Sequence, residues 1–144
     1  MRSRKLHENQ GQRTFTLVFE TGDEAMAGLK RFAEENALGA AQITGIGAFR
    51  DVTLGYFNWE KKAYQKISVA EQVEVLSLIG DVAQDQGKPK VHVHIVVGRS
   101  DGTTWGGHLI EGYVRPTLEV ILTESPAHLR KEYDPESGLT LIRP

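Results

Sequence analysis

The segments Pro89-Lys-Val-His-Val-His-Ile-Val-Val-Gly98 and Trp105-Gly-Gly-His-Leu-Ile110 are separated by a short polar turn that contains Asp101-Gly102. Together they predict a β-hairpin. Successive side chains of a strand point to opposite faces of the sheet. In the first strand, His92 and His94 therefore share one face. The other face carries four aliphatic side chains: Val91, Val93, Ile95 and Val97.

Two imidazoles at positions i and i+2 of a strand form a bidentate pair for a divalent metal, and His108 in the second strand would add a third ligand. Three histidines leave one tetrahedral position open, as in catalytic or ligand-exchanging sites. The alternative is a polar outer strand face in which histidine has no special role. Three of the five histidines of the chain fall in this short stretch, which favours the metal site.

The register of the hairpin sets a condition on His108. A two-residue turn at Asp101-Gly102 would pair His108 with Ile95 and point the imidazole into the apolar layer. A three-residue loop over 100–102, or a bulge at Gly106-Gly107, would bring it to the side of the other two histidines. The metal hypothesis therefore requires an odd loop or a bulge.

Length and composition narrow the class of protein. The 144 residues suffice for one domain with a hydrophobic core, and 17 basic against 19 acidic residues give no general attraction to nucleic acid. The absence of cysteine excludes disulfides, thiolate nucleophiles and cysteine-based zinc sites. No segment has the length of a membrane span, and the first residues lack the apolar stretch of a signal peptide. We therefore expect a cytoplasmic protein with no membrane partner.

The remaining pattern predicts an α+β fold, mainly an antiparallel β-sheet with one principal helix near the N-terminus. The helix follows a Thr-x-x-Glu capping pattern at Thr21-Gly-Asp-Glu24 and extends to about Ala37. Residues 1–12 are expected to form a flexible basic tail, so that a single domain spans 13–144, with a polar surface tail from 126 onward. Besides the hairpin, strands are predicted over 14–20, 40–45, 52–59, 63–68, 73–80 and 117–123.

Four polar residues are candidates for binding a ligand or holding the imidazoles in place: Glu74, Glu111, Glu119 and Arg115. Glu74 alternates with Leu76 and Leu78, so its carboxylate is expected on an apolar face, where it would need a partner or a raised pKa. The alternative is an edge position satisfied by an arginine or a subunit contact. Glu119 shares a face with Ile121 in the same way, and Arg115 either binds an anion or flanks the turn before Pro116.

Six short motifs occur in a characteristic order: Ile43-Thr-Gly-Ile-Gly-Ala48, Val75-Leu-Ser-Leu-Ile-Gly80, Gly87-Lys-Pro-Lys-Val-His-Val-His94, Asp101-Gly102, Gly106-Gly-His-Leu109 and Val114-Arg-Pro-Thr-Leu-Glu-Val120. Over about residues 14–124 this order resembles the PPC domain, the plants and prokaryotes conserved domain, in its stand-alone prokaryotic form. In plants the domain follows AT-hooks that grip the minor groove of AT-rich DNA. No Arg-Gly-Arg-Pro hook occurs in this chain.

The resemblance implies an α+β fold with an antiparallel sheet, assembled as a homotrimer. It also implies a divalent metal on His92, His94 and His108. Zinc is the ion expected there, although three neutral imidazoles suit nickel, copper or iron about as well. Glu74 matches the glutamate of a plant Gly-Arg-Phe-Glu-Ile-Leu segment that is linked to partner binding, although Gln72-Val73 departs from that segment.

Three functions remain as hypotheses. The first is a homotrimer whose three-histidine metal site binds a small oxygen-bearing ligand in the open position, with metal-assisted chemistry on that ligand as an extension. The second is a DNA-binding or DNA-associated regulatory protein, in which binding is weak or absent without the hook. Its support in the sequence is a set of basic residues near the N-terminus: Arg2, Arg4, Lys5 and Arg13. The third is a trimeric partner-binding module without activity.

Overall fold

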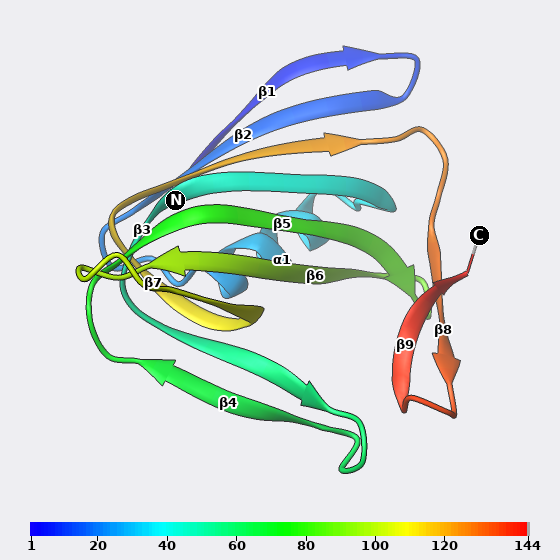
Figure 1. Ribbon diagram of the computed structural model, residues 1–144. Coiled ribbons are helices and arrows are strands. Elements are labelled where there is room, and N and C mark those ends of the chain that lie inside the picture. Colours follow the sequence, from blue (N-terminus) through cyan, green and yellow to red (C-terminus); the bar gives the residue numbers. More distant parts are fainter. Residues whose placement is uncertain (144) are drawn as a thin grey trace.

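The computed structural model describes residues 1–143 of the chain (Figure 1). In this range, the strands are mostly antiparallel and there is a single helix, as predicted. The elements follow one another in the order β1 (Arg2–Asn9), β2 (Gln12–Glu20), α1 (Ala25–Glu35), β3 (Ala40–Asn58), β4 (Ala63–Val69), β5 (Val73–Asp85), β6 (Lys88–Gly98), β7 (Thr104–Glu124), β8 (Arg130–Asp134) and β9 (Leu139–Arg143).

The sheet curls because its two long strands, β3 and β7, each take part in two regions of it (Figure 1). They pair with each other from Ala41↔Glu124 to Gly55↔His108. The first half of β3 also pairs with β5 and its second half with β4, whereas β7 pairs first with β6 and later with β2. Since β5 also pairs with β6, the strands β3, β5, β6 and β7 form a closed circuit of hydrogen-bonded pairs. This circuit places the middle of β6 beside the start of β7.

Helix α1 covers one face of the sheet and is anchored by Glu24. The Glu24 carboxylate accepts hydrogen bonds from the backbone N–H groups of Met26 and Ala27, and it also accepts one from Gly112 of β7 at 3.0 Å. The predicted capping box named Thr21 as the N-cap, which is wrong. The chain turns at Gly22, which has a φ of 93°, and the helix begins only at Ala25. Within residues 1–143, no helix reaches the length and apolarity needed to cross a membrane.

The hydrophobic core lies between α1 and the sheet, as the alternating pattern predicts. The aliphatic face of β6 is buried in it together with three side chains of β2 and the inner face of α1. The buried hydrophobic residues of these three elements are Phe15, Leu17, Phe19, Ala25, Met26, Leu29, Phe32, Ala33, Val91, Val93, Ile95 and Val97.

Three expectations about the course of the chain are wrong. Residues expected in a flexible tail form β1, which pairs along β2 from Arg2↔Val18 to Asn9↔Gln12. All eight residues of β1 are exposed, and Leu6 is the one apolar residue among them. The strand is held by backbone pairing, so its sequence shows no hydrophobic alternation that would predict a strand. The strands predicted over 40–45 and 52–59 are one strand, β3. The expected surface tail from 126 contains the β8–β9 hairpin, in which β8 pairs with the end of β5; Pro144 lies outside the described residues.

Candidate metal centre

The β6–β7 hairpin has the odd register that a three-histidine site requires. The N–H of Arg99 donates to the carbonyl of Thr103 at 2.9 Å and closes a three-residue loop over 100–102. Gly102 takes the left-handed conformation at the end of this loop, with a φ of 82°, and donates to the Arg99 carbonyl at 2.9 Å. Pairing then runs from Gly98↔Thr104 to His94↔His108. Of the two arrangements that would satisfy the metal hypothesis, the structure has the three-residue loop, and His108 lies directly opposite His94.

The imidazoles of His92, His94 and His108, here called the three-histidine cluster, converge on one point. One ligand nitrogen from each lies within 4.8 Å of the other two, and the Nε2 atoms of His92 and His94 are 3.2 Å apart. Nitrogen ligands about 2.0–2.1 Å from a tetrahedral zinc ion stand roughly 3.3 Å from one another. The spacing in the cluster therefore needs only small side-chain movements to hold such an ion.

The protonation states of the cluster suit metal binding. Burial, reinforced by His92 and His94, lowers the pKa of His108 to about 4. Burial also lowers the pKa of His94, with a further contribution from His92. These imidazoles are neutral at pH 7, which is the form that binds metals. The Nδ1 atom of His108 is buried and accepts or donates no hydrogen bond within residues 1–143, so it is a polar atom that lacks a partner.

A carboxylate in contact with the cluster belongs to Asp81 of β5, which lies opposite His92 in the β5–β6 ladder. Its Oδ2 is 3.4 Å from Nδ1 of His92, and its Oδ1 is 3.0 Å from Nζ of Lys131 in β8, whose side chain is only 5% exposed. Burial alone would raise the pKa of Asp81, but hydrogen bonds with His92 and Lys131 outweigh it and hold the pKa below its usual value. Asp81 therefore stays ionised and can hold the His92 ring in one orientation.

The sequence analysis missed Asp81 and Lys131. The strand predicted over 73–80 stops one residue before Asp81, whereas β5 continues to Asp85. Lys131 lies in a segment that was expected to be a tail. Had β5 been extended, the antiparallel pairing of β5 and β6 would have placed a carboxylate opposite His92.

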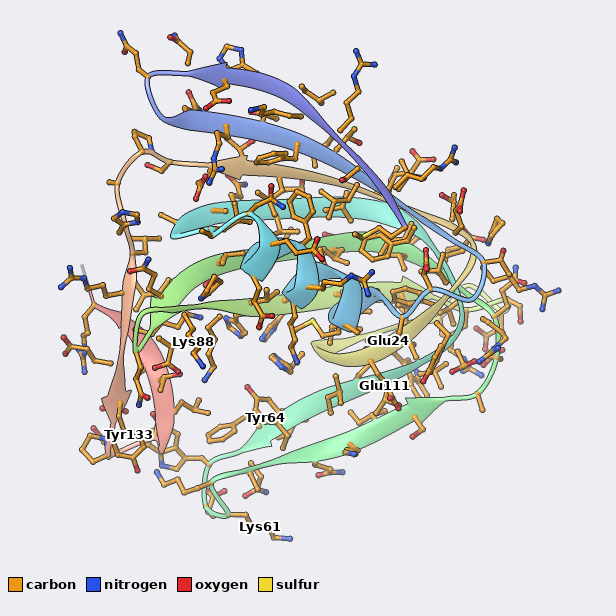
Figure 2. The ribbon with its side chains drawn as sticks, turned by 180° about the vertical axis from the view of Figure 1, so that it is seen from behind. Glu24, Lys61, Tyr64, Lys88, Glu111 and Tyr133 are labelled. Atoms are coloured by element: carbon orange, nitrogen blue, oxygen red, sulfur yellow. The ribbon has the colours of Figure 1, made fainter. Side chains whose placement is uncertain are left out.

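A cleft of about 690 Å³ opens beside the cluster, among α1, β6, β4 and the β8–β9 hairpin. The ring of Tyr64 forms one side of it and stacks on His108 with 4.7 Å between ring centroids. Figure 2 shows Tyr64 on the arm formed by β3 and β4, with β6 and α1 above it in this view. His92, His108 and Asp81 also line this cleft, so a molecule inside it could reach the histidines.

The four polar residues proposed as supporting groups lie elsewhere. All four are exposed, and within residues 1–143 none has an ion pair or hydrogen bond with the cluster: Glu74, Glu111, Glu119 and Arg115. Glu111 accepts a hydrogen bond from Thr53. In the view of Figure 2 it lies on the same side of the molecule as Glu24, at the start of α1. Glu119 lies opposite Ile46 in the β3–β7 ladder.

The prediction that the Glu74 carboxylate lies on an apolar face is wrong. A register shift between Val75 and Ser77 lets Leu78 enter the core, while Glu74 and Leu76 both stay on the exposed face. Glu74 pairs with Gly98, at the far end of the β5–β6 ladder from Asp81 and His92.

With this geometry established, the chain can be assigned to a family. Residues 6–126 match the Plants and Prokaryotes Conserved (PCC) domain, so the chain belongs to that family, the PPC domain of the resemblance described above. The β8–β9 hairpin lies beyond the matched region.

Solved structures support the assignment. A plant- and prokaryote-conserved (PPC) protein from Pyrococcus horikoshii is 34% identical, with 92% of each chain covered and a TM-score of 0.85. A metal-containing protein, AF0104 from Archaeoglobus fulgidus, is also 34% identical, with 98% of this chain and 100% of that chain covered and a TM-score of 0.84. A protein from Bacteroides thetaiotaomicron, described as a candidate DNA-binding protein, is 26% identical over 98% and 96% of the two chains, with a TM-score of 0.87.

A curated relative is much longer than this chain. The bifunctional protein GlmU from Synechococcus sp. (strain JA-3-3Ab) is 29% identical over 129 residues, which is 88% of this chain and 20% of that protein. The chain thus spans about a fifth of the length of this relative.

Proposed function

We propose that this PCC-domain protein binds a divalent metal ion through His92, His94 and His108 and takes a small oxygen-bearing ligand in the remaining coordination position. The observation that carries the proposal is the convergence of one ligand nitrogen from each histidine within 4.8 Å. Three protein ligands with one open position are typical of sites that exchange a ligand.

Two further observations support it. The buried Nδ1 of His108 lacks a partner within residues 1–143, and an unpaired buried polar atom is costly unless something binds there or the ring reorients. A relative that is 34% identical over its whole length is described as metal-containing. Zinc suits three imidazoles in tetrahedral geometry and is the metal we propose.

The surrounding side chains have distinct tasks in this proposal. The Asp81 carboxylate lies 3.4 Å from Nδ1 of His92, where it would hold the ring with Nε2 facing the centre. Lys131 holds Asp81 in place from the other side, and Tyr64 covers one face of His108. A bound zinc ion would supply a Lewis acid that polarises an oxygen atom of the ligand.

Metal uptake tests the proposal directly. Titration of chelator-treated protein with zinc should give one equivalent per chain by isothermal titration calorimetry. Single substitutions His92→Ala, His94→Ala and His108→Ala should each abolish most of this uptake, while His7→Ala on the exposed strand β1 should leave it unchanged. Wild-type protein that takes up no stoichiometric zinc, cobalt or nickel would refute the proposal.

We also propose that the protein assembles as a homotrimer. Three residues lie opposite one another on adjacent strands: Ile79 on β5, Thr44 on β3 and Ile121 on β7. They therefore share the outer face of the sheet, away from α1. Ile79 is 58% exposed. Other exposed aliphatic side chains of these and the neighbouring strand are Ile46, Leu76 and Val96. A face of this kind is usually covered by association.

DNA binding has less support in the structure than metal binding. Three of the four basic residues that favoured it contact carboxylates: Arg2 with Glu20, Lys5 with Glu8, and Arg13 with Glu124. Their charges are thus partly compensated within the protein. The description of the Bacteroides relative keeps DNA binding as the second candidate function.

A further inference from the structure

The charge around the cluster points to the kind of ligand that the open position would take. A histidine bound to a metal is neutral, so three of them leave both positive charges of a divalent ion uncompensated. The carboxylate beside them, Asp81, is already paired with the buried ammonium group of Lys131. The protein thus offers little negative charge to the ion, and an anionic oxygen ligand is favoured over a neutral one.

The cleft beside the cluster has the same electrostatic character. Its lining includes three lysines, Lys30, Lys90 and Lys131, and two carboxylates, Asp81 and Glu34. Lys90 is paired with Asp85 and Lys131 with Asp81, so the charges around the cleft balance. A divalent ion on His92 and His108 would make the cleft positive. Positive charge in a partly enclosed cleft raises the local concentration of anions.

The cleft is also large and partly apolar. Its volume of about 690 Å³ is within the range of small-molecule sites and far exceeds the space that a metal-bound water needs. Its walls include Met26 and Val91 and, from β9, the residues Leu139, Leu141 and Ile142. Such walls favour a ligand that has an apolar body as well as a charged group.

The apolar wall from β9 lies outside the part of the chain that matches the family. The match ends at residue 126, whereas β9 spans Leu139–Arg143. The β8 strand of the same hairpin contributes Lys131, which contacts Asp81. The hairpin therefore supplies both a wall of the cleft and a contact that supports His92.

We propose that the cleft binds a small organic carboxylate with an apolar body. One carboxylate oxygen occupies the open position on the metal, and the apolar body packs against Met26 of α1 and Leu141 of β9. This inference rests on the proposed metal site, because the metal provides the main attraction for the carboxylate.

Cobalt-substituted protein provides the test, since the visible spectrum of Co²⁺ responds to a change of ligand. Acetate, butanoate and hexanoate are titrated into the cobalt protein, with hexanamide as a neutral control, and affinities are measured by calorimetry in parallel. We expect each carboxylate to change the spectrum and hexanamide to leave it unchanged. Affinity should rise by up to about fourfold for each methylene group that becomes buried.

A matched pair of variants tests the role of the hairpin. Leu141→Ser should weaken hexanoate binding several-fold and leave acetate binding nearly unchanged, because acetate does not reach that wall. Leu6→Ser on β1, where the side chain is also exposed, should change neither. Both side chains are partly solvent-exposed, so both variants are expected to fold.

The outcomes separate this inference from the proposed function. Cobalt uptake without any spectral response to carboxylates overturns the inference and leaves the metal site standing. Equal affinities for acetate and hexanoate, or unchanged hexanoate binding in Leu141→Ser, also overturn it. Failure of the protein to take up cobalt, nickel or zinc overturns both, and a protein that takes up only zinc is titrated with the same ligands by calorimetry alone.

Discussion

At the scale of single residues, the site depends on a carboxylate that joins two strands. Asp81 contacts both His92 and Lys131, and the Lys131 side chain is almost fully buried. Groups that contact the second ring nitrogen of a metal-binding imidazole typically contribute 10- to 100-fold to metal affinity. The contact with Lys131 also means that Asp81 compensates a buried charge, so its removal affects folding as well as metal binding.

Asp81→Asn should therefore weaken zinc binding by about 10- to 100-fold, measured by competition with a chromogenic chelator. Asp85→Asn is the control, because Asp85 contacts the exposed Lys90 and not a histidine. The single variant leaves Lys131 without its charged partner, so Asp81→Asn/Lys131→Met should be more stable to urea than Asp81→Asn alone. Equal zinc affinity in wild-type protein and Asp81→Asn would show that His92 needs no such support.

The low pKa of His108 predicts how the metal-free protein responds to acid. In the unfolded chain, histidine has a pKa near 6.5, whereas burial holds that of His108 at about 4 in the fold. Between these values the unfolded state binds more protons, so the free energy of unfolding should fall as the pH is lowered from 6.5 towards 4. The slope should approach ~1.4 kcal/mol per pH unit for this one group.

Urea denaturation at several pH values, with chelator present, measures this slope. His108→Gln should reduce it, whereas His7→Gln on exposed β1 should leave it unchanged. Unequal slopes in wild-type protein and His7→Gln, or equal slopes in wild-type protein and His108→Gln, would contradict the prediction. In metal-loaded protein, zinc should dissociate as the pH falls, because protons compete for the imidazoles.

At the scale of elements, the register of the β6–β7 hairpin determines whether the histidines meet. Arg99 and Thr103 close the loop over 100–102, and the four residues between Thr103 and His108 place His108 opposite His94. One residue fewer between Thr103 and His108 would pair His108 with Ile95 and turn it to the other face. The metal site thus depends on the spacing of His108 from the loop as well as on the three ligands.

Deletion of Thr104 tests this dependence, since it keeps the loop and all three histidines but moves His108 opposite Ile95. The deletion variant should lose stoichiometric zinc binding in calorimetry, while Thr104→Ala should keep it. Circular dichroism should show that both variants retain the sheet, because the core-facing residues of β6 are untouched. Full zinc affinity in a folded deletion variant would contradict this account of the register.

At the scale of the whole molecule, the exposed aliphatic residues of the outer sheet face are expected to be covered by other copies of the chain in a trimer. Multi-angle light scattering at micromolar concentration should give the mass of a trimer. Ile121→Glu, on that face, should shift the mass towards the monomer because a buried unpaired carboxylate is costly. Tyr133→Glu, on the exposed β8 strand, should not. A monomer mass for the wild-type protein would contradict the trimer.

The overall charge of the molecule bears on nucleic acid. With a net charge of -2 and with Arg2, Lys5 and Arg13 in contact with carboxylates, binding to DNA should be weak, independent of sequence and lost near physiological salt. Fluorescence anisotropy with AT-rich and GC-rich duplexes measures it. Nanomolar affinity for the AT-rich duplex at physiological salt would instead favour a DNA-binding function.

The sequence alone determined the features that depend on local periodicity. Successive side chains of a strand point to opposite faces. The sequence of β6 therefore placed His92 and His94 on one face and four buried aliphatic residues on the other: Val91, Val93, Ile95 and Val97. The same reasoning located β2 and the helix and gave an odd loop or a bulge as the condition for a metal site, and the order of motifs indicated the family.

Only the tertiary structure decided which distant residues meet. Asp81 and Lys131 belong to strands separated by 44 residues of chain, and their contact depends on how β5 and β8 pair, which no local pattern encodes. Strand β1 has no apolar face, and a single bulge in β5 moved Glu74 out of the expected apolar layer. Pairing and register are set by the packing of the complete sheet, whereas hydrophobic alternation reports only which side of each strand is buried.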